Sequence, residues 1–351
     1  MRPKNEGSGR LVRSANRRTR ADETSAPLAA LLLALLFAMN AGAQAIAVTP
    51  RGTVVAHDRS LELHDGARIV WRADGVANPS LVVANDQQAA AIDPLANEVA
   101  ISDLASGRAT ITKTGETPVD ALFLGRDLYI LNRDSRTLQR GSATIALAAD
   151  PAFLRESRGT LYVYSRLEGV LQEIGTRPFA IRRTLKIAPF ASDMQLDASF
   201  AYLTYPRAGK LVIVDLAKMK PYGEQKVGAV PISVAIVSRK LAVADPSAKR
   251  VWMIEGAQTF SQAVARGFLR GLIGLGLNRN RTWQFPSGID RVLARGSSWI
   301  AYDSSTGTIY RSGRPIAQSV GPHAFALTRE GIVWWDDTAL RLHKSTAVQD
   351  D

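Results

Sequence analysis

Residues 89–102, AAAIDPLANEVAIS, decide the fold, because residues 241–254, LAVADPSAKRVWMI, repeat their pattern. In each stretch an apolar run ends in Asp-Pro, a short polar turn follows, and a second apolar run begins. Short apolar runs on either side of such a turn are typical of a β-hairpin. Both stretches therefore predict a pair of strands.

Six other stretches fit the same frame, so the chain contains eight units. The first strand of each pair closes at a residue that recurs mostly every 33 to 40 positions: His57, Asp93, Asn132, Ser165, Tyr205, Asp245, Asp303 and Asp336. Each unit has room for four short strands, which we expect in the third unit at 121–124, 128–131, 137–140 and 143–147. This period is typical of β-propeller blades. We predict an all-β propeller of eight four-stranded blades, or alternatively seven, with one helical insertion.

At the level of single blades the sequence resembles known propeller families. LAVADPSAKRVWMIEG and AAAIDPLANEVAISDLASG are similar to the repeats of NHL and YVTN propellers, and AYDSSTGTIYR (301–311) faintly resembles a blade motif of quinoprotein propellers. The resemblance covers nearly all of residues 46–344. It implies a propeller that binds other molecules, and it implies no particular reaction.

The N-terminal residues 1–45 have the pattern of a signal peptide. Seven basic residues precede an apolar run at 28–39, and Ala43-Gln44-Ala45 has the small residues of a cleavage site. We expect a mature periplasmic or secreted protein that begins at Ile46, with residues 46–351 forming the propeller. Retention of 28–39 as a membrane anchor is the alternative.

Composition restricts the partners and the chemistry. The net charge is +12, and the 37 basic and 29 acidic residues of 46–351 keep +8 of it, which favours acidic partners. The basic residues are scattered and form no nucleic-acid module, so nucleic acid is not expected. The absence of cysteine excludes thiol catalysis and thiolate metal sites. Neither a zinc-protease motif nor a nucleophile-elbow motif occurs.

One column of polar residues precedes the innermost strands. Strand alternation places it at one mouth of the central channel, which we call the top: Ser80, Asp120, Asp193, Ser233, Asp290 and His323. Carboxylates and an imidazole there could hold Ca²⁺ or form an acid/base pair, and lactonase-like propellers carry a metal at this mouth. The alternative is a solvated polar rim. The aspartates that close the second strands are expected to bond the backbone of their own turns.

Residues 259–281 differ from the rest of the chain. An apolar stripe at helical spacing consists of Phe260, Val264, Phe268, Leu272 and Leu275, with Arg266 and Arg270 beside it. Its four glycines weaken a helix, so this helix needs a surface to pack on. We expect a docking element at the bottom rim, against the propeller, a partner, a second copy or lipid.

These features predict a non-catalytic scaffold that binds a protein or another ligand outside the cytoplasm. No cofactor is expected, except that Ca²⁺ could bind at the top mouth. The alternative is an enzyme that uses the top mouth, either a metal-dependent lactonase or hydrolase or a quinoprotein-like oxidoreductase. The sequence leaves the ligand, the closing strand of the ring and the oligomeric state open.

Overall fold

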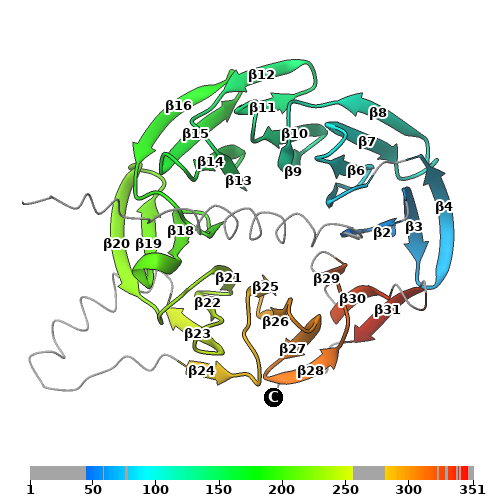
Figure 1. The fold of residues 1–351 in the computed structure, drawn as a ribbon. Helices are drawn as coiled ribbons and strands as arrows, with labels where there is room; N and C mark the ends of the chain where they lie inside the picture. Colours follow the sequence, from blue (N-terminus) through cyan, green and yellow to red (C-terminus); the bar gives the residue numbers. More distant parts are fainter. Residues whose placement is uncertain are drawn as a thin grey trace, which may run out of the picture. The chain divides into compact units, whose positions relative to one another are not determined.

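The described residues form a ring of eight antiparallel sheets. The computed structural model describes residues 45–57, 59–75, 78–255, 281–321, 324–328, 331–336, 339 and 341–346. Within these ranges seven sheets have four strands and the eighth has three. Figure 1 shows the sheets as blades around a centre, with strands such as β4, β8, β16 and β20 at the rim. The prediction of an eight-bladed propeller is confirmed, and the seven-bladed alternative is wrong.

Blades 1 to 4 follow one another along the chain. Blade 1 consists of β1 (Ala45–Thr49), β2 (Gly52–His57), β3 (Ser60–Asp65) and β4 (Arg68–Asp74), and blade 2 of β5 (Leu81–Ala84), β6 (Gln88–Asp93), β7 (Glu98–Asp103) and β8 (Ala109–Lys113). Blade 3 consists of β9 (Pro118–Leu124), β10 (Asp127–Asn132), β11 (Thr137–Arg140) and β12 (Ala143–Ala146), and blade 4 of β13 (Pro151–Ser157), β14 (Thr160–Ser165), β15 (Val170–Thr176) and β16 (Phe179–Lys186).

Blades 5 to 8 complete the ring. Blade 5 consists of β17 (Asp193–Leu196), β18 (Phe200–Tyr205), β19 (Lys210–Asp215) and β20 (Lys220–Lys226), and blade 6 of β21 (Ser233–Val237), β22 (Lys240–Asp245), β23 (Arg250–Glu255) and β24 (Arg281–Gln284). Blade 7 consists of β25 (Arg291–Arg295), β26 (Ser298–Asp303), β27 (Thr308–Arg311) and β28 (Arg314–Ala317), and blade 8 of β29 (Phe325–Leu327), β30 (Gly331–Asp336) and β31 (Arg341–Thr346). A single turn of 3₁₀ helix, η1 (Pro206–Ala208), is the one helix in these ranges.

The ring closes between blade 8 and blade 1. The innermost strand β29 contacts β1, just as β1 contacts β5 and each later inner strand contacts the next. One apolar cluster continues across this junction and contains Ile46, Val55, Tyr302 and Trp335. Because every blade buries its faces against two neighbours, the closed ring supplies the core.

Short, nearly continuous apolar runs explain why these sequences form buried strands. In the third unit, β9 to β12 cover the four strands predicted from the sequence, except that β12 ends at Ala146, one residue before the predicted end. The second strands are the most deeply buried, as in β18, where Ala201 to Tyr205 are all buried between neighbouring sheets. Short apolar runs bounded by turn residues therefore suffice to place the core.

Two of the sequence predictions fall outside the described residues. The predicted signal peptide, except Ala45, and insertion residues 259–280 are not described. The strands on either side of the insertion, β23 and β24, are the third and fourth strands of blade 6 and pair with each other. No helix in the described ranges has the length and apolarity needed to cross a membrane.

Candidate functional site

The top mouth is formed by the beginnings of the inner strands. Five of the six residues that the sequence places there are described, namely Ser80, Asp120, Asp193, Ser233 and Asp290, and His323 lies outside the described residues. Ser80 precedes β5, and its N–H donates to the carbonyl of Ile92 at 2.9 Å. The other four residues make different contacts.

Asp120 connects blade 3 to blade 4. Its Oδ1 accepts the N–H of Ala121 at 2.9 Å. Its Oδ2 accepts the N–H of Leu154 at 2.9 Å and Nη1 of Arg155 at 2.7 Å, both from β13. Arg155 continues to blade 5, where its Nε donates to the carbonyl of Met194 at 2.9 Å. One carboxylate and one guanidinium thus join three inner strands.

Asp193 repeats this arrangement one step around the ring. Its Oδ1 accepts the N–H of Met194 at 2.7 Å, and its Oδ2 accepts the N–H of Val234 on β21 at 2.9 Å. The hydroxyl of Ser233 also donates to Oδ2, at 3.0 Å, and accepts the N–H of Val292 on β25 at 3.3 Å. Asp193 and Ser233 therefore connect blades 5, 6 and 7.

These contacts give the polar column a structural role. In Asp120 and Asp193 one oxygen accepts the next N–H of its own strand, and the other accepts an N–H from the neighbouring inner strand. A backbone N–H that is left unpaired at a buried junction is costly, so these bonds favour closure of the ring. Arg155 lies between the two carboxylates, with Nη2 3.9 Å from Oδ1 of Asp193.

Asp290 belongs to a different environment. Its Oδ2 accepts the N–H of Ser304 at 3.1 Å and also the Ser304 hydroxyl. Burial raises the pKa of Asp290 despite these hydrogen bonds. Burial lowers the pKa of the adjacent Arg291, while the negative charges of Asp193 and Asp290 oppose that shift. The structure brings Asp120, Asp193 and Ser233 into one network and leaves Asp290 bonded to its own blade.

The chemistry of these groups limits what the mouth can bind. Within the described ranges no three His, Asp or Glu side chains are placed together so that they could hold a metal ion. A Ca²⁺ site needs six to eight oxygen ligands around one point, whereas Asp120 and Asp193 both face the guanidinium of Arg155. Asp290 is a described carboxyl group of the mouth whose pKa burial raises, and a raised pKa favours proton transfer near neutral pH.

The aspartates that close the second strands bond their own turns, as the sequence predicts. Oδ1 of Asp93 accepts the N–H groups of Leu95 and Ala96 at 2.8 and 2.9 Å. Asp245 accepts the Ser247 hydroxyl at 2.6 Å, and its second oxygen accepts the N–H of Ala229 at 2.7 Å. Burial raises the pKa of Asp245, but its hydrogen bonds together bring the pKa below its usual value. The role of these residues is to hold turns and crossovers.

A buried polar cluster at the junction of blades 8 and 1 was not predicted. Oε2 of Glu62 lies 2.8 Å from Nε2 of His64 and 3.2 Å from Nε2 of His57, and Oε1 accepts Nη1 of Arg72 at 3.1 Å. The His57 ring stacks on Trp335 of blade 8, with 4.5 Å between the ring centres. The sequence carries no signal for this cluster, because its histidines have no metal-binding spacing and Trp335 is far away in the chain.

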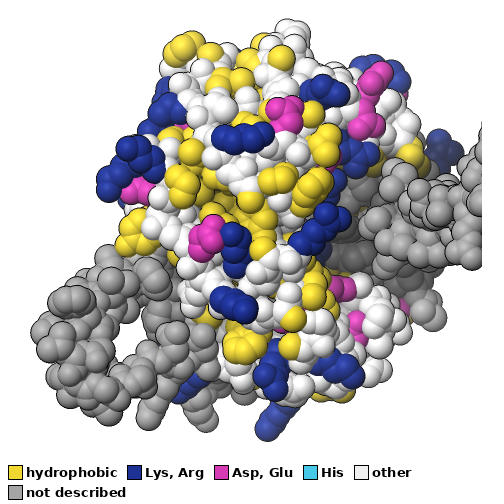
Figure 2. All heavy atoms as spheres, turned by 60° about the vertical axis from the view of Figure 1, so that its left-hand side comes forward, with side chains coloured by type: hydrophobic (Ala, Val, Ile, Leu, Met, Phe, Trp, Pro, Cys, Tyr) yellow, Lys and Arg dark blue, Asp and Glu magenta, His cyan; other side chains and the backbone are white. Residues whose placement is uncertain are grey.

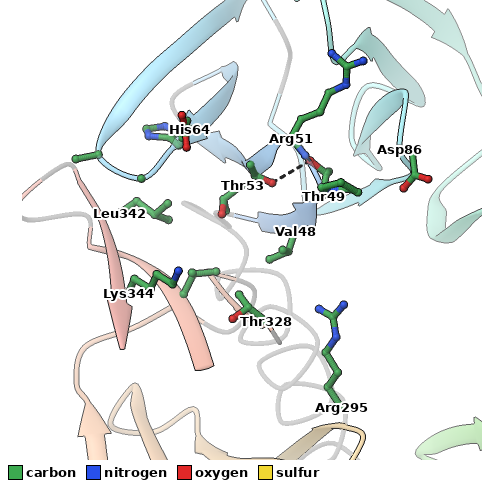
Figure 3. Close-up of a pocket in the computed structure, with 16 residues that line it drawn as sticks. Val48, Thr49, Arg51, Thr53, His64, Asp86, Arg295, Thr328, Leu342 and Lys344 are labelled. Atoms are coloured by element: carbon green, nitrogen blue, oxygen red, sulfur yellow. Dashed lines mark hydrogen bonds between the residues drawn. The ribbon is translucent and has the colours of Figure 1, made fainter. Parts of the chain in front are cut away.

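A hollow of about 830 Å³ on the bottom face was also missed. Its described lining comes from the first turns of blades 7, 8, 1 and 2, from the β3–β4 turn and from β31. Figure 3 shows side chains of these four blades around it, with Lys344 and Arg295 on either side of Thr328. These loops share no motif, so only the folded ring reveals that they meet.

Comparison with known proteins supports the fold and no more specific identity. No protein-family model matches the sequence, and the search of curated proteins finds no match. The structure is similar to BamB from Moraxella catarrhalis, with a TM-score of 0.60 and 12% identity over 85% of this chain and 91% of that chain. It is also similar to a streptogramin B lyase, with a TM-score of 0.52 and 9% identity over 72% of this chain and 88% of that chain.

A third neighbour is BBS1N, solved in complex with ARL6DN. Its TM-score is 0.50 and its identity 12%, over 71% of this chain and 83% of that chain. Identities this low establish a shared β-propeller architecture only. Because the neighbours include a lyase and a protein in a complex, function has to be argued from the surface of this chain.

Proposed function

We propose that this protein is an extracytoplasmic β-propeller scaffold that binds a partner protein and catalyses no reaction. The observation that carries the proposal is the use of the polar side chains at the top mouth. Asp120, Asp193 and Ser233 bond one inner strand to the next and do not surround a common point. Side chains that hold the ring together are poorly suited to acid/base or metal chemistry, because any displacement would open a blade junction.

Export is part of the proposal. The basic, apolar and small-residue pattern of residues 1–45 is that of a signal peptide, and retention of 28–39 would instead tether the propeller to a membrane. We infer that the blades are of the NHL or YVTN kind, on the apolar–Asp–turn–apolar pattern that they share. The BBS1N structure, solved with ARL6DN, provides a precedent for a similar propeller engaging another protein.

Asp290 supports a second candidate function. A carboxyl group whose pKa is raised by burial, close to a channel mouth, is a recognised sign of a general acid or base. The similarity to a streptogramin B lyase is compatible with an enzyme on this fold. In this alternative the protein is a hydrolase, lactonase or oxidoreductase, and Asp290 transfers the proton.

The experiment compares complex formation with turnover. The full chain with a C-terminal tag is expressed in its own cells, and extracytoplasmic and cytoplasmic fractions are purified under native conditions. The scaffold proposal expects a complex of fixed stoichiometry by native mass spectrometry in the extracytoplasmic fraction. A version without residues 1–45 is the control, since it stays in the cytoplasm. Turnover of ester, lactone or quinone substrates that is lost in Asp290→Asn would overturn the proposal in favour of the enzyme.

A further inference from the structure

The crossover that connects β16, the outer strand of blade 4, to β17, the inner strand of blade 5, presents an aromatic side chain to solvent. Phe190 is 44% exposed, although phenylalanine is normally buried. Its φ angle is 65°, in the left-handed region that a bulky side chain rarely adopts. The residue is therefore exposed and occupies an unfavourable backbone conformation.

Two buried tyrosines hold this crossover rigidly. The hydroxyl groups of Tyr164 and Tyr205 both donate to the carbonyl of Ala188 at 2.8 Å. The N–H of Ala191 in turn donates to the Tyr164 hydroxyl at 3.2 Å. Burial raises the pKa of both tyrosines, so both hydroxyls keep their protons and remain donors. The backbone on either side of Phe190 is thus fixed.

The neighbouring crossovers show that the fold does not require an aromatic residue here. Thr117 and Asp150 take the same place before blades 3 and 4, with φ angles of 51° and 57°. The Thr117 carbonyl accepts the N–H of Arg133 in blade 3, and the Asp150 carbonyl accepts the N–H of Arg166 in blade 4. Each arginine begins the turn between the second and third strands of its blade. At these two crossovers a polar side chain occupies the left-handed position.

A second exposed apolar side chain and a cation lie next to Phe190. The N–H of Phe190 donates to the carbonyl of Arg166 at 2.9 Å, and the following residue, Leu167, is 56% exposed. From blade 5, Cζ of Arg207 lies 5.2 Å from the centre of the Phe190 ring. Leu167, Phe190 and Arg207 together form what we call the blade 4/5 surface.

The charged groups near this surface are three basic side chains, Arg166, Arg207 and Lys186, whose Nζ donates to the Glu168 carbonyl, and two acidic ones, Asp150 and Glu168. Asp150 is paired with Arg166, at 2.9 Å, and Oε1 of Glu168 accepts the N–H of Ala149. The nearby acidic groups are therefore engaged within the protein. Figure 2 shows the side of the propeller that carries β16 and β20, where hydrophobic side chains gather among Lys and Arg side chains. Residues 46–351 carry a net charge of +8, which also favours an acidic partner.

We propose that the blade 4/5 surface is a docking site for an acidic segment of a partner protein that carries an apolar side chain. Leu167 and Phe190 would contact the apolar side chain, and Arg207 would pair with a carboxylate beside it. Rigid, exposed aromatic and arginine side chains are the residue types that dominate binding at protein interfaces. This inference rests on the proposed scaffold function and specifies its partner.

The test uses a fluorescein-labelled peptide, Asp-Leu-Glu-Trp-Glu-Leu-Asp, and the same peptide with lysine at each acidic position. The full chain should bind the acidic peptide at least about tenfold more tightly than the lysine peptide. Phe190→Asn should weaken binding about tenfold or more, as for an interface anchor, and Leu167→Ser and Arg207→Gln should weaken it as well. Asn tolerates a left-handed φ, so Phe190→Asn removes the ring without disturbing the turn.

The matched control is Leu95→Ser. Leu95 lies in the corresponding second turn of blade 2 and is 74% exposed, so its loss should leave peptide binding unchanged. No binding of the acidic peptide, or equal binding by Phe190→Asn, would overturn the inference. Equal or tighter binding to phosphatidylglycerol vesicles, lost in Phe190→Asn, would overturn it in favour of a lipid surface. If the native complex persists in Phe190→Asn, the scaffold function stands and the blade 4/5 surface is not its site.

Discussion

The guanidinium of Arg155 lies between two blades, bonded to the Asp120 carboxylate at 2.7 Å on one side and to the Met194 carbonyl at 2.9 Å on the other. Both side chains are largely buried, with 27% of Arg155 and 18% of Asp120 exposed. Loss of one partner of such an ion pair costs more stability than loss of one at the surface, because the remaining partner is left desolvated and without its counter-charge.

We therefore expect Asp120→Ala to reduce the free energy of unfolding by about 2 to 3 kcal/mol, since it leaves Arg155 without its paired carboxylate and the N–H of Leu154 on β13 without its acceptor. Urea denaturation of the propeller measures this loss. Asp127→Ala in the same blade is the control, because Asp127 is 52% exposed and lies 4.0 Å from Arg140. The control should change stability by less than about 0.5 kcal/mol. Equal effects of the two changes would contradict the structural role of Asp120.

Asp245 should make the propeller sensitive to acid. Its hydrogen bonds lower its pKa in the folded state, so its stabilising contribution is present above about pH 4 and lost as the pH falls through the folded value. We expect Asp245→Asn to be less stable than the wild type at pH 7 by about 2 kcal/mol, because the amide places a donor against existing donors. The difference should shrink below pH 4. Asp65→Asn, at a side chain that is 67% exposed, should show no such trend.

Asp290 should have the opposite pH dependence. Burial raises its folded pKa, so the folded state binds the proton more tightly than the unfolded chain. The stability of the wild type should then fall as the pH rises from about 4 through the folded pKa, and Asp290→Asn should escape that fall. Denaturation at the two pH values should show that the free energy of unfolding of the variant, relative to that of the wild type, is higher at pH 8 than at pH 4. If the variant is instead less stable relative to the wild type at pH 8 than at pH 4, the folded state favours the charged form of Asp290.

Calcium should not stabilise the protein through the top mouth. Asp120 and Asp193 both face Arg155, so a cation there would have to displace the guanidinium and break the blade junctions. We expect about 5 mM CaCl₂, which exceeds the dissociation constants of extracellular calcium modules, to change the melting temperature by less than about 1 °C. A larger rise that disappears in Asp193→Asn would demonstrate a calcium site.

The strands could be predicted because each is marked locally. In blade 3 the predicted strands 128–131 and 137–140 correspond to β10 and β11. Polar turn residues at the ends of both strands made them recognisable. The sequence also placed Asp120, Asp193 and Ser233 on one rim, because their distance from the inner strands is constant. The place of a residue within the blade repeat is enough to predict the rim on which it lies.

The contacts of these residues could not be predicted. Arg155 lies 35 residues from Asp120, inside β13, and carries no turn or motif signal. Its reach depends on the distance between neighbouring blades, which the repeat does not encode. The same holds for His57 and Trp335, which come together only when blade 8 closes on blade 1. The left-handed φ of Phe190 is likewise a property of the crossover and not of its residue type.

Replacement of residues 259–280 by a short Gly/Ser turn should leave the propeller folded. The strands that flank this segment, β23 and β24, pair directly, and Met253 is opposite Arg281 at the end of the ladder. A hairpin turn is enough to connect two antiparallel strands in this register. Circular dichroism should retain the β-sheet spectrum, and the melting temperature should stay within a few degrees of the wild type.

The change Phe268→Asp tests the role that the sequence predicts for the same segment. A charge in an apolar contact carries a large desolvation cost, so the substitution should weaken self-association or membrane binding if the segment is a docking element. Sedimentation velocity and vesicle flotation measure the two kinds of binding, with Gln258→Asp outside the predicted stripe as the control. Unfolding on replacement of 259–280 would instead make the segment part of the core. Loss of a ligand at the top mouth would contradict its place at the bottom rim, because β23 and β24 meet there and the inner strands begin on the opposite face.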